Sequence, residues 1–120
     1  MTALAEGAVR STGPAWTRAC RYDSLTAERG VAVLINDRQI ALYRLDDGTV
    51  RAIGNRDPFS GANVMSRGLV GTRVGTDVVF SPMFKQAFSL ETGECLDDPT
   101  EAVPWYPVRI VDGDVLVGAP

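Results

Sequence analysis

Short apolar runs bounded by turn residues follow one another along most of the chain. Asn36-Asp37, Asp46-Asp47-Gly48 and Asp112-Gly113 separate neighbouring runs, and such residues are typical of hairpin turns. Because the runs are short and several alternate between apolar and polar residues, they predict an all-β fold, an antiparallel sandwich or small barrel. The expected strands are VAVLI (31–35), QIALYRL (39–45), TVRAI (49–53), DVVFS (77–81), QAFSL (86–90), and PVRIV with DVLVG within 107–118.

The N-terminal residues differ in composition from the rest of the chain. Residues 1–14 are rich in small residues and end in Gly13-Pro14, so we expect a flexible tail followed by a single domain over residues 15–120. No run approaches the roughly 18 apolar residues of a membrane span. The N-terminus has no basic start and carries Glu6, which argues against an export or organellar signal and predicts a cytoplasmic protein.

The amino-acid composition excludes several classes of function. The 12 basic residues are scattered along a chain of net charge −3, so the basic patch of a nucleic-acid-binding protein is missing. The chain has no histidine, which excludes Ser-His and Cys-His nucleophiles, HExxH zinc sites and histidine-ligated haem. Cys20 and Cys95 form no CxxC motif and are expected to be reduced.

Two similar loops carry the most specific pattern, NRDPFSG (55–61) and SPMFKQAFSLETG (81–93). They resemble the two loops of Rieske [2Fe-2S] domains, which carry CxH and CPxHG and hold one iron by two Cys and the other by two His. Pro82, Phe88 and Gly93 agree with that pattern. The four ligand positions hold other residues: Asn55, Asp57, Ser81 and Phe84.

The substituted ligand positions predict a Rieske-like fold with two loops at one tip and an empty cluster site. An amide, a hydroxyl and a phenyl ring cannot replace thiolate and imidazole donors, and the Asp57 carboxylate alone cannot hold a cluster. Asp57 is open to three readings: the start of a turn before Pro58, a polar contact with a partner, or a metal ligand. An acidic tract over residues 94–101 lacks the order of a calcium loop and is expected to be a solvated turn.

This ligand-free version resembles one family in particular, the small subunit of the cytoplasmic, assimilatory NAD(P)H-dependent nitrite reductase. The resemblance covers about residues 16–117. It implies an accessory subunit without a cofactor, supporting a large subunit that carries FAD, sirohaem and [4Fe-4S] and reduces nitrite to ammonia. The segments that carry it are RQIALYRLDDGTVRAI, NRDPFSGANVMSRGLVG, SPMFKQAFSLETGECLDDP and YPVRIVDGDVLV.

The residues therefore point to contacts with a partner instead of catalysis, and we expect no catalytic, cofactor-binding or metal-binding residue. Trp105 and Tyr106 stand on a segment stiffened by Pro104 and Pro107, where an interface role and core packing are equally open. The candidate contact residues are Arg56, Arg67, Met83, Phe84, Lys85, Trp105 and Tyr106.

Two other functions are weighed against the accessory subunit. A Rieske-like shell also suits a cluster-free binding or regulatory module of another oxidoreductase or oxygenase system, since a fold does not fix its partner. An independent hydrolase or isomerase is disfavoured, because the loops contain neither histidine nor paired carboxylates.

Overall fold

The protein is described by a computed structural model over residues 15–119, so the expected tail at residues 1–14 lies outside the described residues, as does Pro120. Within this range ten strands form three antiparallel sheets, and two 3-10 turns are the helical segments, which confirms the all-β prediction. The elements are β1 (Ala15–Arg21), η1 (Tyr22–Ser24), β2 (Gly30–Ile35), β3 (Arg38–Arg44), β4 (Val50–Gly54), η2 (Met65–Arg67), β5 (Leu69–Arg73), β6 (Thr76–Phe80), β7 (Ala87–Ser89), β8 (Trp105–Tyr106), β9 (Val108–Val111) and β10 (Asp114–Ala119).

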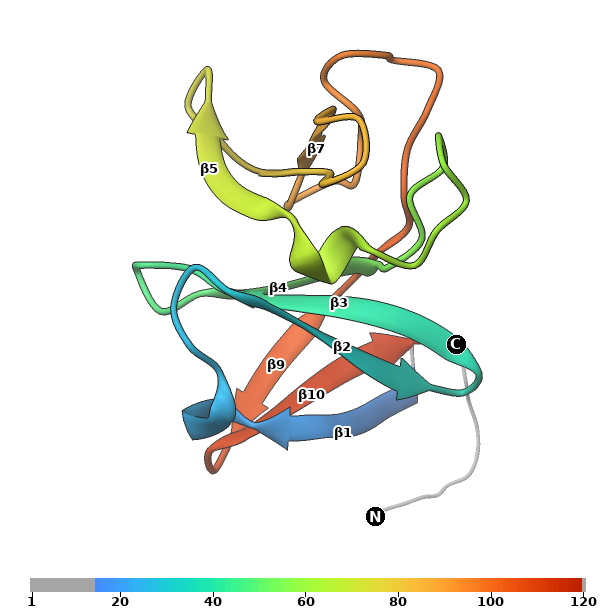
Figure 1. The fold of residues 1–120 in the computed structure, drawn as a ribbon. Helices are drawn as coiled ribbons and strands as arrows, with labels where there is room; N and C mark the ends of the chain where they lie inside the picture. The colour runs from blue at the N-terminus through green and yellow to red at the C-terminus, as the bar shows by residue number, and fades with distance from the viewer. Residues whose placement is uncertain (1–14, 120) are drawn as a thin grey trace.

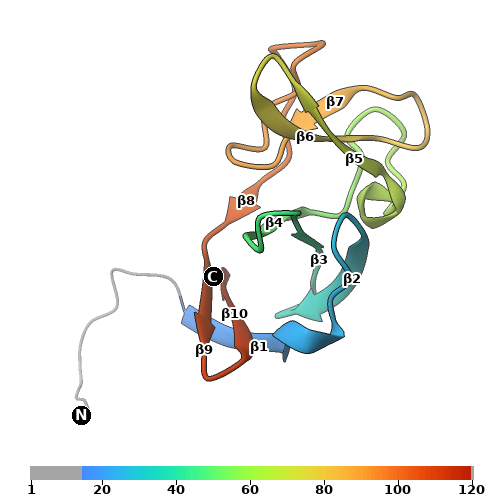
Figure 2. The same cartoon turned by 90° about the vertical axis from the view of Figure 1, so that its left-hand side faces the viewer.

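The sheets divide into a barrel-like base and a smaller lobe above it (Figures 1 and 2). The base combines the sheet β1-β10-β9 with the sheet β2-β3-β4-β8. The lobe holds the sheet β5-β6-β7 together with the long connections on either side of it. None of the helical segments described between residues 15 and 119 has the length and apolarity that a bilayer span requires.

Strand β3 is buried on both faces because it lies between two hydrophobic clusters. Ile40 and Leu42 point into the cluster inside the base, while Ala41 and Tyr43 point into the cluster between the base and the lobe. Successive side chains of a strand face opposite ways, so one strand serves both clusters. The sequence predicted that apolar residues of this run alternate with polar ones. That detail is wrong, because the lobe covers the second face of β3.

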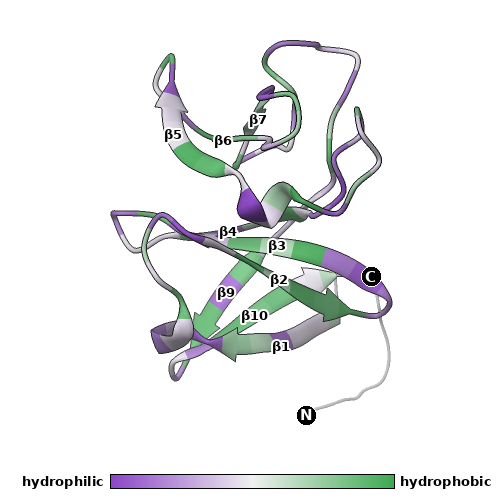
Figure 3. Ribbon diagram, in the orientation of Figure 1, coloured by the Kyte–Doolittle hydropathy of each residue, from purple (hydrophilic) through white to green (hydrophobic). Residues whose placement is uncertain are grey.

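The backbone conformations of the hairpin turns explain which strands could be predicted from the sequence. Asn36 and Asp37 have φ of 50° and 65°, and Asp112 and Gly113 have φ of 51° and 80°, the positive values that such turns require. The β5–β6 turn places Val74 at φ 54°, which a β-branched residue rarely adopts, so Val74 gave no signal of a hairpin and β5 was not predicted. Figure 3 shows the β2–β3 turn as hydrophilic beside the apolar strands it joins.

Candidate functional site

The two loops of the sequence pattern both belong to the upper lobe of Figure 1. Loop 1 (residues 55–61) follows β4, and loop 2 (residues 81–86) follows β6. Loop 1 is closed by the Gly61 amide, which donates to the Asp57 carbonyl at 2.7 Å. Loop 2 is closed by the Lys85 amide, which donates to the Ser81 carbonyl at 2.9 Å.

A hydrogen bond between two of the four ligand positions joins the loops. The Ser81 hydroxyl donates to Asp57 Oδ2 at 2.6 Å, and both side chains are buried. The other carboxylate oxygen of Asp57, Oδ1, accepts the Phe59 amide at 2.8 Å. Of the three readings of Asp57, the structure therefore places it as a turn residue that also fastens loop 1 to loop 2.

The third ligand position, Asn55, is also buried and fully engaged. Its amide nitrogen donates to Gln39 Oε1 at 3.2 Å and to the Asn63 carbonyl at 3.3 Å. Its side-chain oxygen accepts the Ser66 amide at 2.8 Å. Asn55 thus connects β3, loop 1 and η2, and these partners could not be read from the sequence because they lie 8 to 16 residues away.

A buried tyrosine supports the same region from below. The Tyr43 hydroxyl donates to the Met65 carbonyl in η2, and burial raises the pKa of Tyr43 well above its ordinary value. Phe59 of loop 1 packs against Phe88 of β7, with ring centroids 6.1 Å apart. Buried and half-buried aromatic side chains therefore support the loops.

Loop 2 is also held by an acidic residue beyond it. Asp97 Oδ2 accepts the Ala87 amide at 2.8 Å, and Asp97 Oδ1 pairs with Arg73 at 2.7 Å. The hydrogen bond from Arg73 lowers the pKa of Asp97 below its ordinary value, so this link is present at neutral pH and weakens as pH falls and Asp97 takes up a proton. Asp97 is exposed, as expected of a solvated turn, and it also makes these two contacts.

The fourth ligand position lies at the surface with several candidate contact residues. Phe84 is 58% exposed and Met83 is 48% exposed, at the tip of loop 2. Arg56, Arg67 and Lys85 are also exposed. Exposed large apolar side chains beside unburied cations are a common composition of protein interfaces.

The two aromatic residues of β8, Trp105 and Tyr106, differ in burial. Tyr106 is 8% exposed and packs in the cluster inside the base, so it is a core residue and not a surface contact. Trp105 is 55% exposed on the other face of the strand. The sequence left packing and contact equally open for both, and strand alternation buries Tyr106 and exposes Trp105, whose contact with a partner stays a prediction.

The residues at the loops do not fit a [2Fe-2S] cluster. Three of the four positions offer an amide, a carboxylate and a hydroxyl that already bond to protein groups, and the fourth offers a phenyl ring. Cys95 belongs to the cluster between base and lobe, and Cys20 packs against the other cluster, so neither reaches the loops. Between residues 15 and 119 no three His, Cys, Asp or Glu side chains gather in a metal-binding group.

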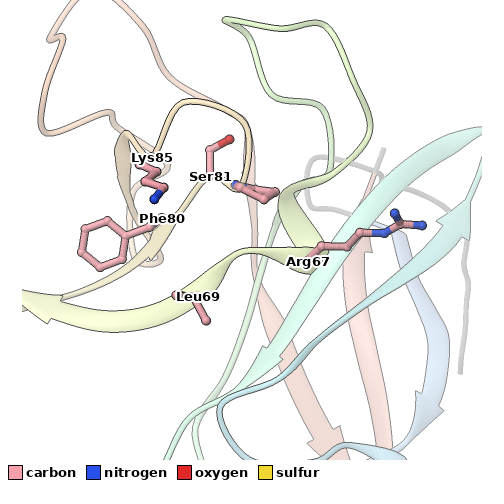
Figure 4. Close-up of a pocket in the computed structure, with 6 residues that line it drawn as sticks. Arg67, Leu69, Phe80, Ser81 and Lys85 are labelled. Atoms are coloured by element: carbon pink, nitrogen blue, oxygen red, sulfur yellow. The ribbon is translucent and has the colours of Figure 1, made fainter.

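A pocket beside loop 2 contains residues that the sequence did not single out. It has a volume of about 280 Å³ and is lined by Arg67, Leu69, Phe80, Ser81, Pro82 and Lys85 (Figure 4). Leu69 is 76% exposed at the start of β5. An exposed leucine beside a glycine carried no signal in the sequence, because only the pairing of β5 with β6 brings it next to loop 2.

The fold and the two-loop tip define the class as a Rieske-like domain whose loops carry other side chains at the cluster-ligand positions. A family model of the Rieske-like [2Fe-2S] domain matches residues 15–118. Within that class, the chain belongs to the family of nitrite reductase small subunits, as its relatives show.

Three relatives carry this assignment. The nitrite reductase (NADH) small subunit of Escherichia coli (strain K12) is 40% identical over 101 residues, which cover 83% of this chain and 94% of that one. A crystal structure from Mycobacterium tuberculosis, provisionally assigned as an NADH-dependent nitrite reductase small subunit, is 57% identical with a TM-score of 0.84, covering 87% of this chain and 94% of that one. The Klebsiella oxytoca nitrite reductase [NAD(P)H] large subunit is 40% identical over 86% of this chain, which spans 11% of that protein.

Proposed function

We propose that this chain is an accessory small subunit of a cytoplasmic NAD(P)H-dependent nitrite reductase and is not catalytic by itself. It docks on a large subunit that reduces nitrite to ammonia in nitrate assimilation, and that subunit carries FAD, sirohaem and [4Fe-4S], as the family resemblance implies. The observation that carries the proposal is the Asp57–Ser81 hydrogen bond, which closes the two loops with protein groups alone. The loops then serve to present Met83 and Phe84 to a partner.

Two further observations support an accessory role. The chain has no histidine, and the buried polar side chains of its loops are already hydrogen-bonded to other groups of the protein. Identities of 40% to 57% with proteins named as nitrite reductase subunits favour this partner over an oxygenase system. The Klebsiella oxytoca protein carries a similar stretch within a large subunit, which is consistent with close association of the two parts.

The accessory role is tested by assembly with the large subunit of the same organism. Co-expressed subunits should elute together on size exclusion, and omitting this chain should lower nitrite-dependent NAD(P)H oxidation by about tenfold or more, a loss of ~1.4 kcal/mol in transition-state stabilisation. Adding back the purified chain should restore the rate. An unchanged rate without this chain would show that it has no part in the activity.

Visible absorption tests whether this chain lacks an iron–sulfur cluster. Purified anaerobically with iron and sulfide, the chain should show no visible absorption of an iron–sulfur cluster, because its loops lack thiolate and imidazole donors. A matched control replaces the four positions with Cys-x-His and Cys-Pro-x-His ligands, as Asn55→Cys, Asp57→His, Ser81→Cys and Phe84→His. A red-brown unmodified chain would refute the cluster-free proposal.

A further inference from the structure

The pocket beside loop 2 has apolar walls and a basic rim. Leu69, Phe80 and Pro82 form the walls, and Lys85 lies at the rim; Arg67 also lines the pocket, but its guanidinium points away from Lys85 in Figure 4. Figure 4 shows the Ser81 hydroxyl pointing away from Phe80 and Lys85, and that hydroxyl is already committed to Asp57. The interior therefore offers apolar contact, and its remaining polar groups are cations.

The pocket is small compared with most pockets that enclose ligands. Its volume of about 280 Å³ lies just below the roughly 300–1,000 Å³ of pockets that enclose small-molecule ligands. It opens beside Met83 and Phe84, the exposed residues between Pro82 and Lys85. Figure 3 shows a hydrophobic start of β5, the strand that begins with Leu69, shortly after the hydrophilic end of η2. Pro82 lines the pocket and is followed by Met83 and Phe84, so the exposed loop tip adjoins the pocket.

The lysine at this surface is not neutralised by the protein itself. Lys85 forms no ion pair with any residue from 15 to 119, and the same is true of several arginines elsewhere, Arg38 among them. The whole chain has a net charge of −3. A partner that brings a carboxylate to the pocket would therefore find the Lys85 ammonium not already neutralised.

The backbone fixes where the lysine stands. Lys85 has a φ of 64°, a conformation that non-glycine residues seldom adopt, and its amide closes loop 2 on the Ser81 carbonyl. A residue held this way by a hydrogen-bonded turn keeps its side chain at the pocket. The backbone and Cβ of Lys85 are thus placed at the pocket before a partner arrives, while its exposed ammonium is free to reach a carboxylate of the partner.

We propose that this pocket is the anchor site for the large subunit, and that it receives an apolar side chain of that subunit flanked by a carboxylate. The apolar side chain fills the space between Leu69, Phe80 and Pro82, and the carboxylate pairs with Lys85. This inference rests on the proposed function and assigns a particular surface and partner chemistry to it.

The test measures binding of the full chain to the purified large subunit by isothermal titration. Lys85→Glu and Leu69→Lys should each raise Kd by about tenfold or more, the effect of a central interface residue. Two matched controls change equally exposed residues elsewhere: Arg38→Glu, an arginine without an ion pair among the described residues, and Leu34→Lys, a leucine 68% exposed on β2. The controls should stay within about twofold of the unmodified chain.

Salt dependence provides a second readout. Raising the salt concentration should weaken binding of the unmodified chain and affect Lys85→Glu much less, because the ion pair is screened only where it exists. Circular dichroism melting of every variant should match the unmodified chain, since all four residues are exposed.

The outcomes separate this inference from the proposed function. If the unmodified chain binds and both pocket variants bind equally well, the pocket is not the anchor, while the accessory role stands. If the controls weaken binding as much as the pocket variants, docking uses another face and the inference fails. If the chain instead forms dimers that Leu69→Lys dissociates, a second copy occupies the pocket. If the unmodified chain does not bind at all, the proposed function fails first.

Discussion

Replacing Asp57 with alanine should lower the free energy of unfolding by about 3 kcal/mol, the largest effect expected at the loops. The substitution removes two hydrogen bonds to a buried carboxylate, from the Ser81 hydroxyl and from the Phe59 amide. It leaves the buried Ser81 hydroxyl without its acceptor, and such a group costs more than a bond lost at the surface. Urea unfolding of the purified chain measures the loss.

Two related variants show whether the link between the loops is responsible. Asp57→Asn keeps the size and one acceptor of the side chain, so we expect it to cost about 1 kcal/mol. Ser81→Ala removes only the donor, and combining it with Asp57→Ala should cost less than the sum of the two single changes, because both act on one bond. Strict additivity, or an Asp57→Ala loss below about 0.5 kcal/mol, would contradict the structural role of this pair.

Replacing Gly93 with alanine should also cost about 3 kcal/mol or more, for a steric reason. Gly93 has a φ of 80°, and a Cβ placed there would lie 2.0 Å from the Val103 carbonyl oxygen. The neighbouring backbone cannot withdraw easily, because the Val103 amide donates to the Gly93 carbonyl at 2.8 Å and the Gly93 amide donates to Ser89 at 2.9 Å. The substitution would separate these two paired segments.

Gly75 provides the matched control for that prediction. Its φ of 76° is nearly the same, but a Cβ there meets no atom within 4 Å. Gly75→Ala should therefore cost about 1 kcal/mol, the conformational penalty alone. Thermal or urea unfolding of the two variants separates the torsional cost from the steric cost, and equal losses would show that the approach to Val103 is unimportant.

Hairpins were predictable where the turn residues themselves favour the required backbone. Asn36-Asp37 and Asp112-Gly113 adopt positive φ at low cost, so the strands beside them could be located from the sequence. Strand β5 was missed because Val74 stands in its turn. Strand β8 was missed because its two residues, Trp105 and Tyr106, become a strand only by pairing with β4.

The site was predictable in position but not in its contacts. The spacing of Asn55, Asp57, Ser81 and Phe84 located both loops, since the resemblance depends on residues that are close together in each loop. The bond between Asp57 and Ser81 joins residues 24 positions apart, and no local pattern indicates such a pairing. The docking pocket likewise required the pairing of Leu69 with Phe80.

The sequence by itself determined the all-β class, the family and the chemical nature of the loops, because turn propensity, strand periodicity and missing donor atoms are local properties. The tertiary structure decided which side chains are buried and which are presented. It placed three of the four ligand positions in the interior as hydrogen-bonded polar groups and left Phe84 at the surface. Burial and long-range hydrogen bonding depend on how the sheets pack, which local sequence does not specify.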